Sequence, residues 1–308
     1  MSSFEREAGE RGAGLVECVP NFSFSEDPEL LEALAQLVKD GGGAVLDGSS
    51  DRDHNRCVLT WVARPQTVVA IAFRLIALAS ERIDLTHHRG VHPRIGACDV
   101  CPLVPLEGFP RTDCVELAHA LGRRVGEELA IPVHFYGDAA RSPEGRELPR
   151  LRRSGFARTR TPDEGPARLH PTAGAIAIGV RSILIAFNVL LETADPAPAR
   201  EIARVIRESC GGLAGIRALG LTLESGGISQ VSVNLCDHEQ TGLIELFERI
   251  EGEARKRGVA VRESELIGLA PRAALDRRIA ARVRLSGFDP EEHVLEENLA
   301  KNLPALWT

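Results

Sequence analysis

The stretch Ile183-Leu184-Ile185-Ala186-Phe187-Asn188-Val189 decides the fold, because it restarts a pattern that the chain has already used once. It is a short apolar run with an asparagine near its end, and Thr193-Ala194-Asp195-Pro196 follows it as a helix start. Residues 15–21 form an earlier run of the same kind, and Ser25-Glu26-Asp27-Pro28 follows that run in the same way. The repeat predicts two units built from the same series of elements.

The segment between residues 28 and 105 completes the first series. The expected helices start at Pro28 and Pro65, and the expected strands are residues 44–47, 57–62 and the apolar end of 83–105. Gly41-Gly42-Gly43 ends the first helix, and the polar run 48–56 is the expected hairpin loop. The order β-α-β-β-α-β is typical of a ferredoxin-like unit.

A further helix and two strands are expected before the restart, at residues 113–129, 132–137 and 173–179. Residues 138–170, which lie between the two strands, are rich in Arg, Pro and Gly and have little apolar periodicity. We therefore expect a long loop there, and loops of that length are uncommon unless they bind something.

The second series follows the restart in the same order. Its expected elements are a helix that ends at Gly211-Gly212, strands at 216–223 and 228–235, a helix at 242–257, a closing strand within 259–269, and outer helices at 272–284 and 290–303. We predict an α+β fold of two tandem ferredoxin-like βαββαβ subdomains, residues 1–180 and 181–308, which form a ligand cleft.

Composition describes an ordinary globular chain. Its 308 residues suggest two domains, and 44% hydrophobic with 26% charged residues is typical of soluble proteins. The net charge of −7 argues against a nucleic-acid binder. No apolar run approaches the roughly 20 residues that span a bilayer, and the charged N-terminus does not resemble a secretory signal. We expect a cytoplasmic protein that does not bind membranes.

Seven scattered cysteines fit reduced thiols better than a disulfide framework. Cys98-Asp99-Val100-Cys101 is a C-x-x-C motif without a second pair at zinc spacing. We expect buried thiols beside a strand and no metal site.

Residues 83–105 form the window that is densest in groups able to move a proton or hold an anion. It contains three histidines, and His92 stands between Gly90, which permits a tight turn, and Pro93, which favours an extended backbone. Histidine is the usual general base near neutral pH. The pattern alone leaves open that this is merely a solvated loop.

Nine motifs in chain order carry a resemblance to a known family. They are Val16–Ser23, Asp53–Arg56, His88–Ala97, Asp99–Pro102, Gly165-Pro166, Gly174-Ala175, Ala186–Val189, Ile228–Leu235 and Ser264–Leu269. Together they resemble the glutamate formiminotransferase family over roughly residues 14–300. The resemblance implies transfer of a formimino group from N-formiminoglutamate to N5 of tetrahydrofolate in histidine catabolism. It also implies a folate-binding cleft, tetrahydrofolate as co-substrate, a homodimer, and a chain without the cyclodeaminase domain that some members carry.

The resemblance also implies site residues. The histidine of the family's Gly-Glu-His-Pro-Arg motif falls on His92, which becomes the expected general base. Arg89 and Arg94 are expected to hold carboxylates, although Arg94 could instead pair with Asp99 or Asp84. The other expected substrate or folate contacts are Asn21, Asn55, Arg56, Asp99, Gly174, Asn188 and Asn234. Asn55 and Arg56 could equally be loop fasteners, whereas Asn188 and Asn234, at strand ends facing the cleft, suit a pterin edge.

Four departures from the family pattern fall on the expected cleft. Val91 replaces the usual glutamate before the histidine, and Ser49 replaces a second aspartate. Phe24–Asp27 lacks a usual glycine and a positive charge, and the segment after Arg153 lacks a glutamate and is shorter toward Gly165. Glu17, Asp99 and Asp53 are the acids that could substitute at Val91. These changes keep a second hypothesis open: a divergent folate-binding or formyl- or formimino-transferring paralogue that does not use formiminoglutamate.

Overall fold

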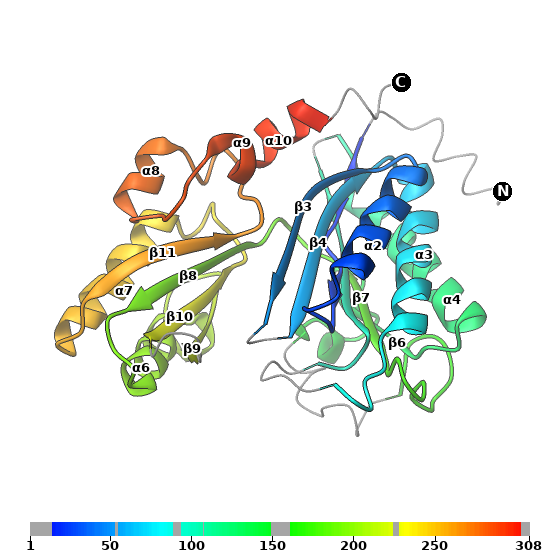
Figure 1. Cartoon of the computed structure of the whole chain (residues 1–308), viewed down its shortest axis with the longest axis horizontal. Helices are drawn as coiled ribbons and strands as arrows, with labels where there is room; N and C mark the ends of the chain where they lie inside the picture. Colours follow the sequence, from blue (N-terminus) through cyan, green and yellow to red (C-terminus); the bar gives the residue numbers. More distant parts are fainter. Residues whose placement is uncertain are drawn as a thin grey trace. The chain divides into compact units, whose positions relative to one another are not determined.

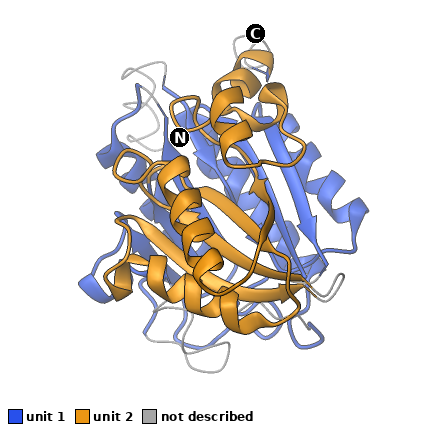
Figure 2. Ribbon diagram, turned by 90° about the vertical axis from the view of Figure 1, so that its left-hand side faces the viewer, with its two compact units in different colours: residues 1–181, 302–308 blue, residues 182–301 orange. Residues whose placement is uncertain are grey.

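The computed structural model describes residues 14–52, 55–88, 94–106, 108–148, 161–223 and 228–302. The chain divides into two compact units (Figure 2): unit 1 is Met1–Arg181 together with Asn302–Thr308, and unit 2 is Ser182–Lys301. Each unit has its own sheet and its own hydrophobic core. The predicted mixed α+β organisation with two sheets is therefore confirmed.

Unit 1 contains a sheet of seven strands. They are β1 (Val16–Cys18), β2 (Asn21–Phe22), β3 (Ala44–Asp51), β4 (Arg56–Ala63), β5 (Cys98–Pro105), β6 (Val133–Gly137) and β7 (Ile176–Val180). β1 and β2 both pair with β4 on one side and β5 on the other, so they form one interrupted strand. Pro20 lies at the interruption, where it has no N–H to give to a ladder. The antiparallel part is extended by β7 and β6, which run parallel to β5.

Three helices cover one face of this sheet (Figure 1). They are α2 (Pro28–Asp40), α3 (Pro65–Arg82) and α4 (Arg111–Glu128). The Asp27 side chain caps α2 by accepting a hydrogen bond from the Leu30 N–H at 2.8 Å, and Pro28 supplies a first-turn residue that needs no donor. The helices bury apolar side chains against sheet residues such as Phe22 and Trp61.

The opposite face of the sheet carries the polar groups that matter for the site. Cys57 and Leu59 belong to the core under the helices, so Arg56 and Val58, which alternate with them, face the other way. Asn21 pairs with Val58 and shares that face. On β5 the register shifts between Cys98 and Val100, which leaves Asp99 as the extra residue of a bulge.

Unit 2 repeats the β-α-β-β-α-β order. Its elements are β8 (Ile185–Leu191), α6 (Pro196–Ile206), β9 (Ile216–Leu223), β10 (Ile228–Leu235), α7 (Leu243–Lys256) and β11 (Val261–Ile267). The strand order is β11-β8-β10-β9, and every pairing is antiparallel. Side chains of α6 and α7, including Ile202 and Phe247, pack into one core with Phe187 and Val231 of the sheet.

Several predicted boundaries were wrong. The expected loop 48–56 is shorter, because the ladder of β3 with β4 continues to the pair Asp51 and Arg56. Short 3-10 turns lie at Pro143–Gly145 and Glu208–Cys210.

The expected C-terminal helices are also interrupted. The helix expected at 272–284 is only α8 (Arg277–Arg282), because Asp276 caps its start by accepting from the N–H groups of Arg278 and Ile279. The last helix is split into α9 (Pro290–His293) and α10 (Leu295–Asn302). Val294 bridges to Ala270 between them. Among the residues described, no helix is long and apolar enough to cross a membrane.

Candidate functional site

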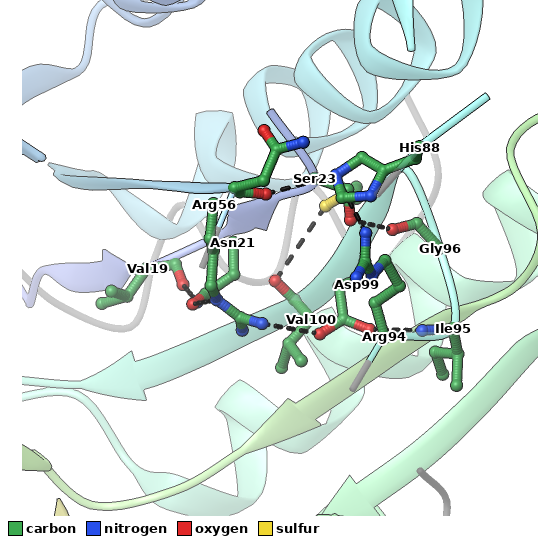
Figure 3. A network of polar contacts seen from close by, with 12 residues as sticks. Val19, Asn21, Ser23, Arg56, His88, Arg94, Ile95, Gly96, Asp99 and Val100 are labelled. Carbon is green, nitrogen blue, oxygen red and sulfur yellow. Dashed lines mark hydrogen bonds and ion pairs between the residues drawn. The ribbon is translucent and has the colours of Figure 1, made fainter. Parts of the chain in front are cut away.

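A polar network on the face of the unit 1 sheet opposite its helices brings together several of the expected site residues (Figure 3). Arg56 is its centre: Nε donates to Asn21 Oδ1 at 2.9 Å, and Nη1 donates to Asp99 Oδ2 at 3.1 Å. Asn21 in turn donates from Nδ2 to the Val19 carbonyl at 2.9 Å. The guanidinium thus ties β4 to β2 and β5, the strands on which the expected ligand residues lie.

Asp99 is a buried carboxylate whose two oxygens both have partners. Its side chain is 1% exposed, Oδ1 accepts from the Ile95 N–H at 2.7 Å, and Oδ2 accepts from Arg56. A buried charge needs this compensation, because an unpaired carboxylate inside a protein is costly. Asp99 therefore holds the backbone just after Arg94 against the sheet.

His88 enters the network although no site role was predicted for it. Its Nε2 lies 3.1 Å from Arg94 Nη1 and 3.2 Å from the Asn55 carbonyl. Arg94 only donates and needs a lone pair on Nε2, whereas the Asn55 carbonyl only accepts and needs a proton there, so one tautomer of His88 can hydrogen-bond only one of the two. Within the described part of the chain, Nδ1 is buried and has no hydrogen-bond partner.

The residues expected to do the chemistry lie between these contacts. Arg89, Val91 and His92 fall in 89–93, outside the described residues. The contact of His88 with Arg94 joins the two ends of that segment. Burial lowers the pKa of the Arg94 guanidinium, and the nearby charge of Asp99 opposes that shift. Arg94 keeps its charge at neutral pH, since the guanidinium starts from a very high pKa.

Backbone contacts anchor the segment that follows Arg94. Ser23 donates its hydroxyl to the Gly96 carbonyl and its N–H to the Ala97 carbonyl, both at 2.8 Å. Gly96 bridges to Gly174, and a Cβ added to Gly96 would lie 1.8 Å from the Ala175 oxygen. Gly174 itself has φ of 72°, in the left-handed region that favours glycine. The structure thus gives Gly174 a backbone role, and a ligand contact there stays a prediction.

The Asn55 side chain links two loops of unit 1. It has φ of 45°, and its Oδ1 accepts a hydrogen bond from the Ser25 hydroxyl at 3.0 Å. Asparagine is one of the few side chains that tolerate this conformation. The contact joins the turn before β4 to the loop before α2. Ser23 and Ser25 were not predicted as site residues, and a single serine in a loop gives no sequence signal for such contacts.

Asn188 and Asn234 share the face of the unit 2 sheet that lies opposite α6 and α7. Asn188 pairs directly with Ser232, two residues from Asn234, and both alternate with core residues. The prediction that both lie at strand ends was wrong for Asn188, which is in the middle of β8, whereas Asn234 is next to the last residue of β10.

Glu17 is the second buried carboxyl group of unit 1. It lies in β1 between Val62 and Val104 and is 5% exposed. Burial raises the pKa of Glu17 to about 7 from its ordinary value of 4.5, and the charge of Arg181 opposes the increase. A carboxyl group with this pKa is partly protonated at neutral pH.

The expectation of buried thiols is confirmed. Cys98 and Cys101 are free and buried on β5, and the Cys101 sulfur lies 3.6 Å from the sulfur of Cys18. Burial raises the pKa of the Cys18 and Cys98 thiols well above the ordinary value. These thiols are therefore poor nucleophiles. In the described ranges, no three His, Cys, Asp or Glu side chains are grouped so that they could hold a metal ion.

Comparison with known proteins gives matches over nearly the whole chain. Residues 15–181 match the family model "Formiminotransferase domain, N-terminal subdomain", and residues 186–288 match "Formiminotransferase domain". A glutamate formimidoyltransferase of Streptococcus pyogenes serotype M1 is 41% identical over 296 residues, which cover 93% of this chain and 99% of that protein. One of Thermoplasma acidophilum is 39% identical over 298 residues, covering 93% and 98%. The formimidoyltransferase-cyclodeaminase of Sus scrofa is 40% identical over 277 residues, 85% of this chain and 51% of that protein.

Proposed function

The chain belongs to the formiminotransferase domain family, and we propose that it is a glutamate formimidoyltransferase. It transfers the formimino group between N-formimino-L-glutamate and N5 of tetrahydrofolate, its co-substrate. The observation that carries the proposal is the 41% identity to an enzyme of this name across 99% of that enzyme's length. The reaction belongs to one-carbon metabolism and to histidine catabolism.

The reaction needs a proton acceptor and a proton donor. The N5 nitrogen attacks the amidine carbon, so an N–C bond forms and N5 must lose its proton. The tetrahedral intermediate then breaks the bond between that carbon and the glutamate nitrogen, which leaves with a proton. One base that accepts the first proton and returns it to the leaving nitrogen balances both steps.

His92 is the proposed base, because a neutral imidazole accepts a proton near pH 7. The network supports this role through its neighbours: His88 and Arg94 are in contact at the two ends of residues 89–93. Asp99 fixes the backbone at Ile95. These contacts fix described residues on either side of 89–93, and efficient proton transfer requires a base that is positioned at the substrate.

The arginines supply the positive charge that anionic substrates need. Arg89 and Arg94 are the proposed partners of substrate carboxylates, while Arg56 and Asn21 hold the network in place and border the ligand. Asn188 and Asn234 are proposed to hydrogen-bond a pterin edge, whose ring nitrogens and amino group match an amide that both donates and accepts.

We also infer that both units derive from a ferredoxin-like βαββαβ unit and that a ligand cleft is part of the enzyme. The support is the strand order β11-β8-β10-β9 and the corresponding antiparallel part of unit 1, to which β7 and β6 are added. A cytoplasmic homodimer stays a prediction. Light scattering at several protein concentrations would test the oligomeric state.

The test is an assay with tetrahydrofolate and N-formimino-L-glutamate, run beside a calorimetric titration with folate. We expect turnover that requires both substrates and releases glutamate in equal amount to the folate product. Folate binding without turnover would contradict the proposal and would favour the divergent paralogue.

A further inference from the structure

The sheet of unit 2 ends in β9, which pairs with β10 on one side and with no other strand among the described residues. The Cys236 N–H donates to the Gly215 carbonyl at 2.8 Å, so these two residues form a hydrogen-bonded pair. Hydrogen-bonded and non-bonded pairs alternate along an antiparallel ladder. The peptide groups of Ala218, Gly220 and Thr222 therefore point away from β10, and no described residue hydrogen-bonds to them.

The other three sheet edges are covered or charged. At the outer edge of β11, the Ser264 N–H donates to the Arg284 carbonyl at 3.0 Å. At the outer edge of β6, the Phe135 N–H donates to the Asp163 carboxylate at 2.8 Å. β3 carries two aspartates in its polar run 47–51. Proteins commonly protect edges in these ways, because an unpaired edge is a template for another strand. In the described part of the chain, β9 is the edge that lacks such a cover.

The face of β9 that points away from the helices carries an apolar stripe. Ile216 and Ala218 belong to the core of unit 2. Leu219, Leu221 and Leu223 alternate with them and lie on the opposite face, where Leu219 is 54% exposed. A strand that pairs with β9 would place its own alternate side chains beside these leucines, so apolar residues suit that face of the partner.

The other face of β9 lies against α6, which presents two arginines to this edge. α6 reaches β9 at Gly220, where an added Cβ would lie 2.2 Å from the Arg200 nitrogen. Glu201 pairs with Arg257 at the end of α7 at 2.9 Å, so that side of α6 faces the neighbouring helix. Arg200 and Arg204, about one turn apart, are exposed on the other side, toward the edge. Within the described residues no ion pair neutralises either of them.

The charge at this edge is opposite to that of the whole chain. The chain carries a net charge of −7, whereas Arg200, Arg204 and the exposed Arg217 make the edge of β9 basic. Complementary charge across an interface guides encounter and excludes wrong partners. Acidic residues therefore suit the face of the partner that lies beside α6.

A second copy of this chain fits the edge poorly. Two β9 strands would pair antiparallel about a two-fold axis, and use of the peptide groups of Ala218, Gly220 and Thr222 places that axis at Gly220. Gly220 lies against Arg200, so the axis would bring the Arg200 residues of both copies together. Like charges brought together in this way cost binding free energy.

We propose that the outer edge of β9 binds, by strand addition, an extended segment of a partner protein in which acidic residues alternate with apolar ones. The main-chain groups of Ala218, Gly220 and Thr222 supply the hydrogen bonds, and the two faces of β9 select the side chains of the partner. The inference is independent of the proposed reaction, because neither the donor nor folate takes part in it.

Fluorescence anisotropy with synthetic peptides tests this proposal on the whole protein. The probe is a labelled peptide of the same length as β9 that alternates glutamate and valine. One control peptide alternates lysine and valine. The other keeps the glutamate sequence but carries N-methyl groups on its peptide nitrogens, which then cannot donate hydrogen bonds. The probe should bind at least about 10-fold more tightly than either control.

Variants of the edge separate the main-chain contacts from the charge contacts. Thr222→Pro removes an outward N–H and leaves the ladder with β10 in place, so probe binding should weaken at least about 10-fold. Arg200→Gln and Arg204→Gln should each weaken it roughly 3-fold, the usual scale of one exposed ion pair. Arg255→Gln is the matched control, because Arg255 is 78% exposed on α7 and should leave the affinity unchanged. Circular dichroism establishes that each variant is folded.

Three other outcomes would overturn the proposal. No binding of the probe, or equal binding of the lysine peptide, would exclude an acidic partner. Affinity that survives both Thr222→Pro and N-methylation would show contact through charge alone, without strand addition. A wild-type dimer that Thr222→Pro converts to a monomer in light scattering would show that a second copy covers β9. If Thr222→Pro does not fold, the N-methylated peptide and the two arginine variants decide.

Discussion

Glu17 should make the protein less stable as the pH rises through neutrality. The group is 5% exposed, and burial raises its pKa to about 7 in the folded chain from an ordinary value of 4.5. Between these two values the folded state binds more protons than the unfolded state. The free energy of unfolding therefore falls as the pH rises from 4.5 to about 7, and the full loss is present above that range.

The size of the effect follows from the two pKa values. Their difference of about 2.5, at about 1.4 kcal/mol for each pKa unit, gives a full loss of about 3 kcal/mol. Between about pH 5 and about pH 8.5, a range that is convenient for measurement, about 2–3 kcal/mol of it should appear. This is a large share of the roughly 5–15 kcal/mol by which domains are usually stable.

The assay is urea unfolding of wild type and Glu17→Gln at a series of pH values. The amide introduced by this substitution cannot ionise, so the variant should gain stability relative to wild type by about 2–3 kcal/mol from about pH 5 to about pH 8.5. Glu32→Gln, an exposed change on α2, should show a nearly constant difference from wild type. A constant difference for Glu17→Gln as well would refute the raised pKa of this buried carboxyl group.

Three further changes test the network and its loop. Gly96→Ala should destabilise unit 1 by at least about 3 kcal/mol in chemical unfolding, because its Cβ would lie 1.8 Å from the Ala175 oxygen. Its control is Gly252→Ala on α7, where a Cβ meets nothing within 4 Å. This control should stabilise the protein by about 0.5–1 kcal/mol. Arg56→Ala should cost about 3–5 kcal/mol, since it leaves the Asp99 carboxylate buried beside an unfilled site; a loss under about 1 kcal/mol in thermal and urea unfolding would speak against the ion pair. Val91→Glu places a carboxylate beside His92, which raises the imidazole pKa, so the acid limb of the pH–rate profile should move to higher pH, and an unmoved limb would separate Val91 from the base.

Much of the fold could be predicted from the sequence, because most of its elements are local. Proline and acidic residues at the helix starts, glycines at the ends and alternating apolar strands give the element order of both units. The errors arose where tertiary pairing overrides local preference. Gly48–Asp51 has no strand character of its own, yet the β4 ladder holds it extended, and the contact of Val294 with Ala270 breaks a helix that the pattern would continue.

The site was only partly predictable. The motifs indicated Asn21, Arg56 and Asp99, and these residues do meet, through contacts between positions 35 and 43 residues apart. His88 could not be distinguished from its neighbour His87 by sequence, since only the folded chain places one of them against Arg94. The raised pKa of Glu17 likewise depends on Val62 and Val104, which are distant in the sequence and adjacent in the sheet.

The most direct test of the central claim is the steady-state kinetics of His92→Ala with N-formimino-L-glutamate and tetrahydrofolate. If this loop carries the general base, kcat should fall by about 10²–10⁴, the usual contribution of a positioned base, while the affinity for tetrahydrofolate stays close to that of wild type. Wild-type kcat in His92→Ala would contradict the account, because the network around Arg94 and Asp99 would then support a structural loop and the base would lie elsewhere.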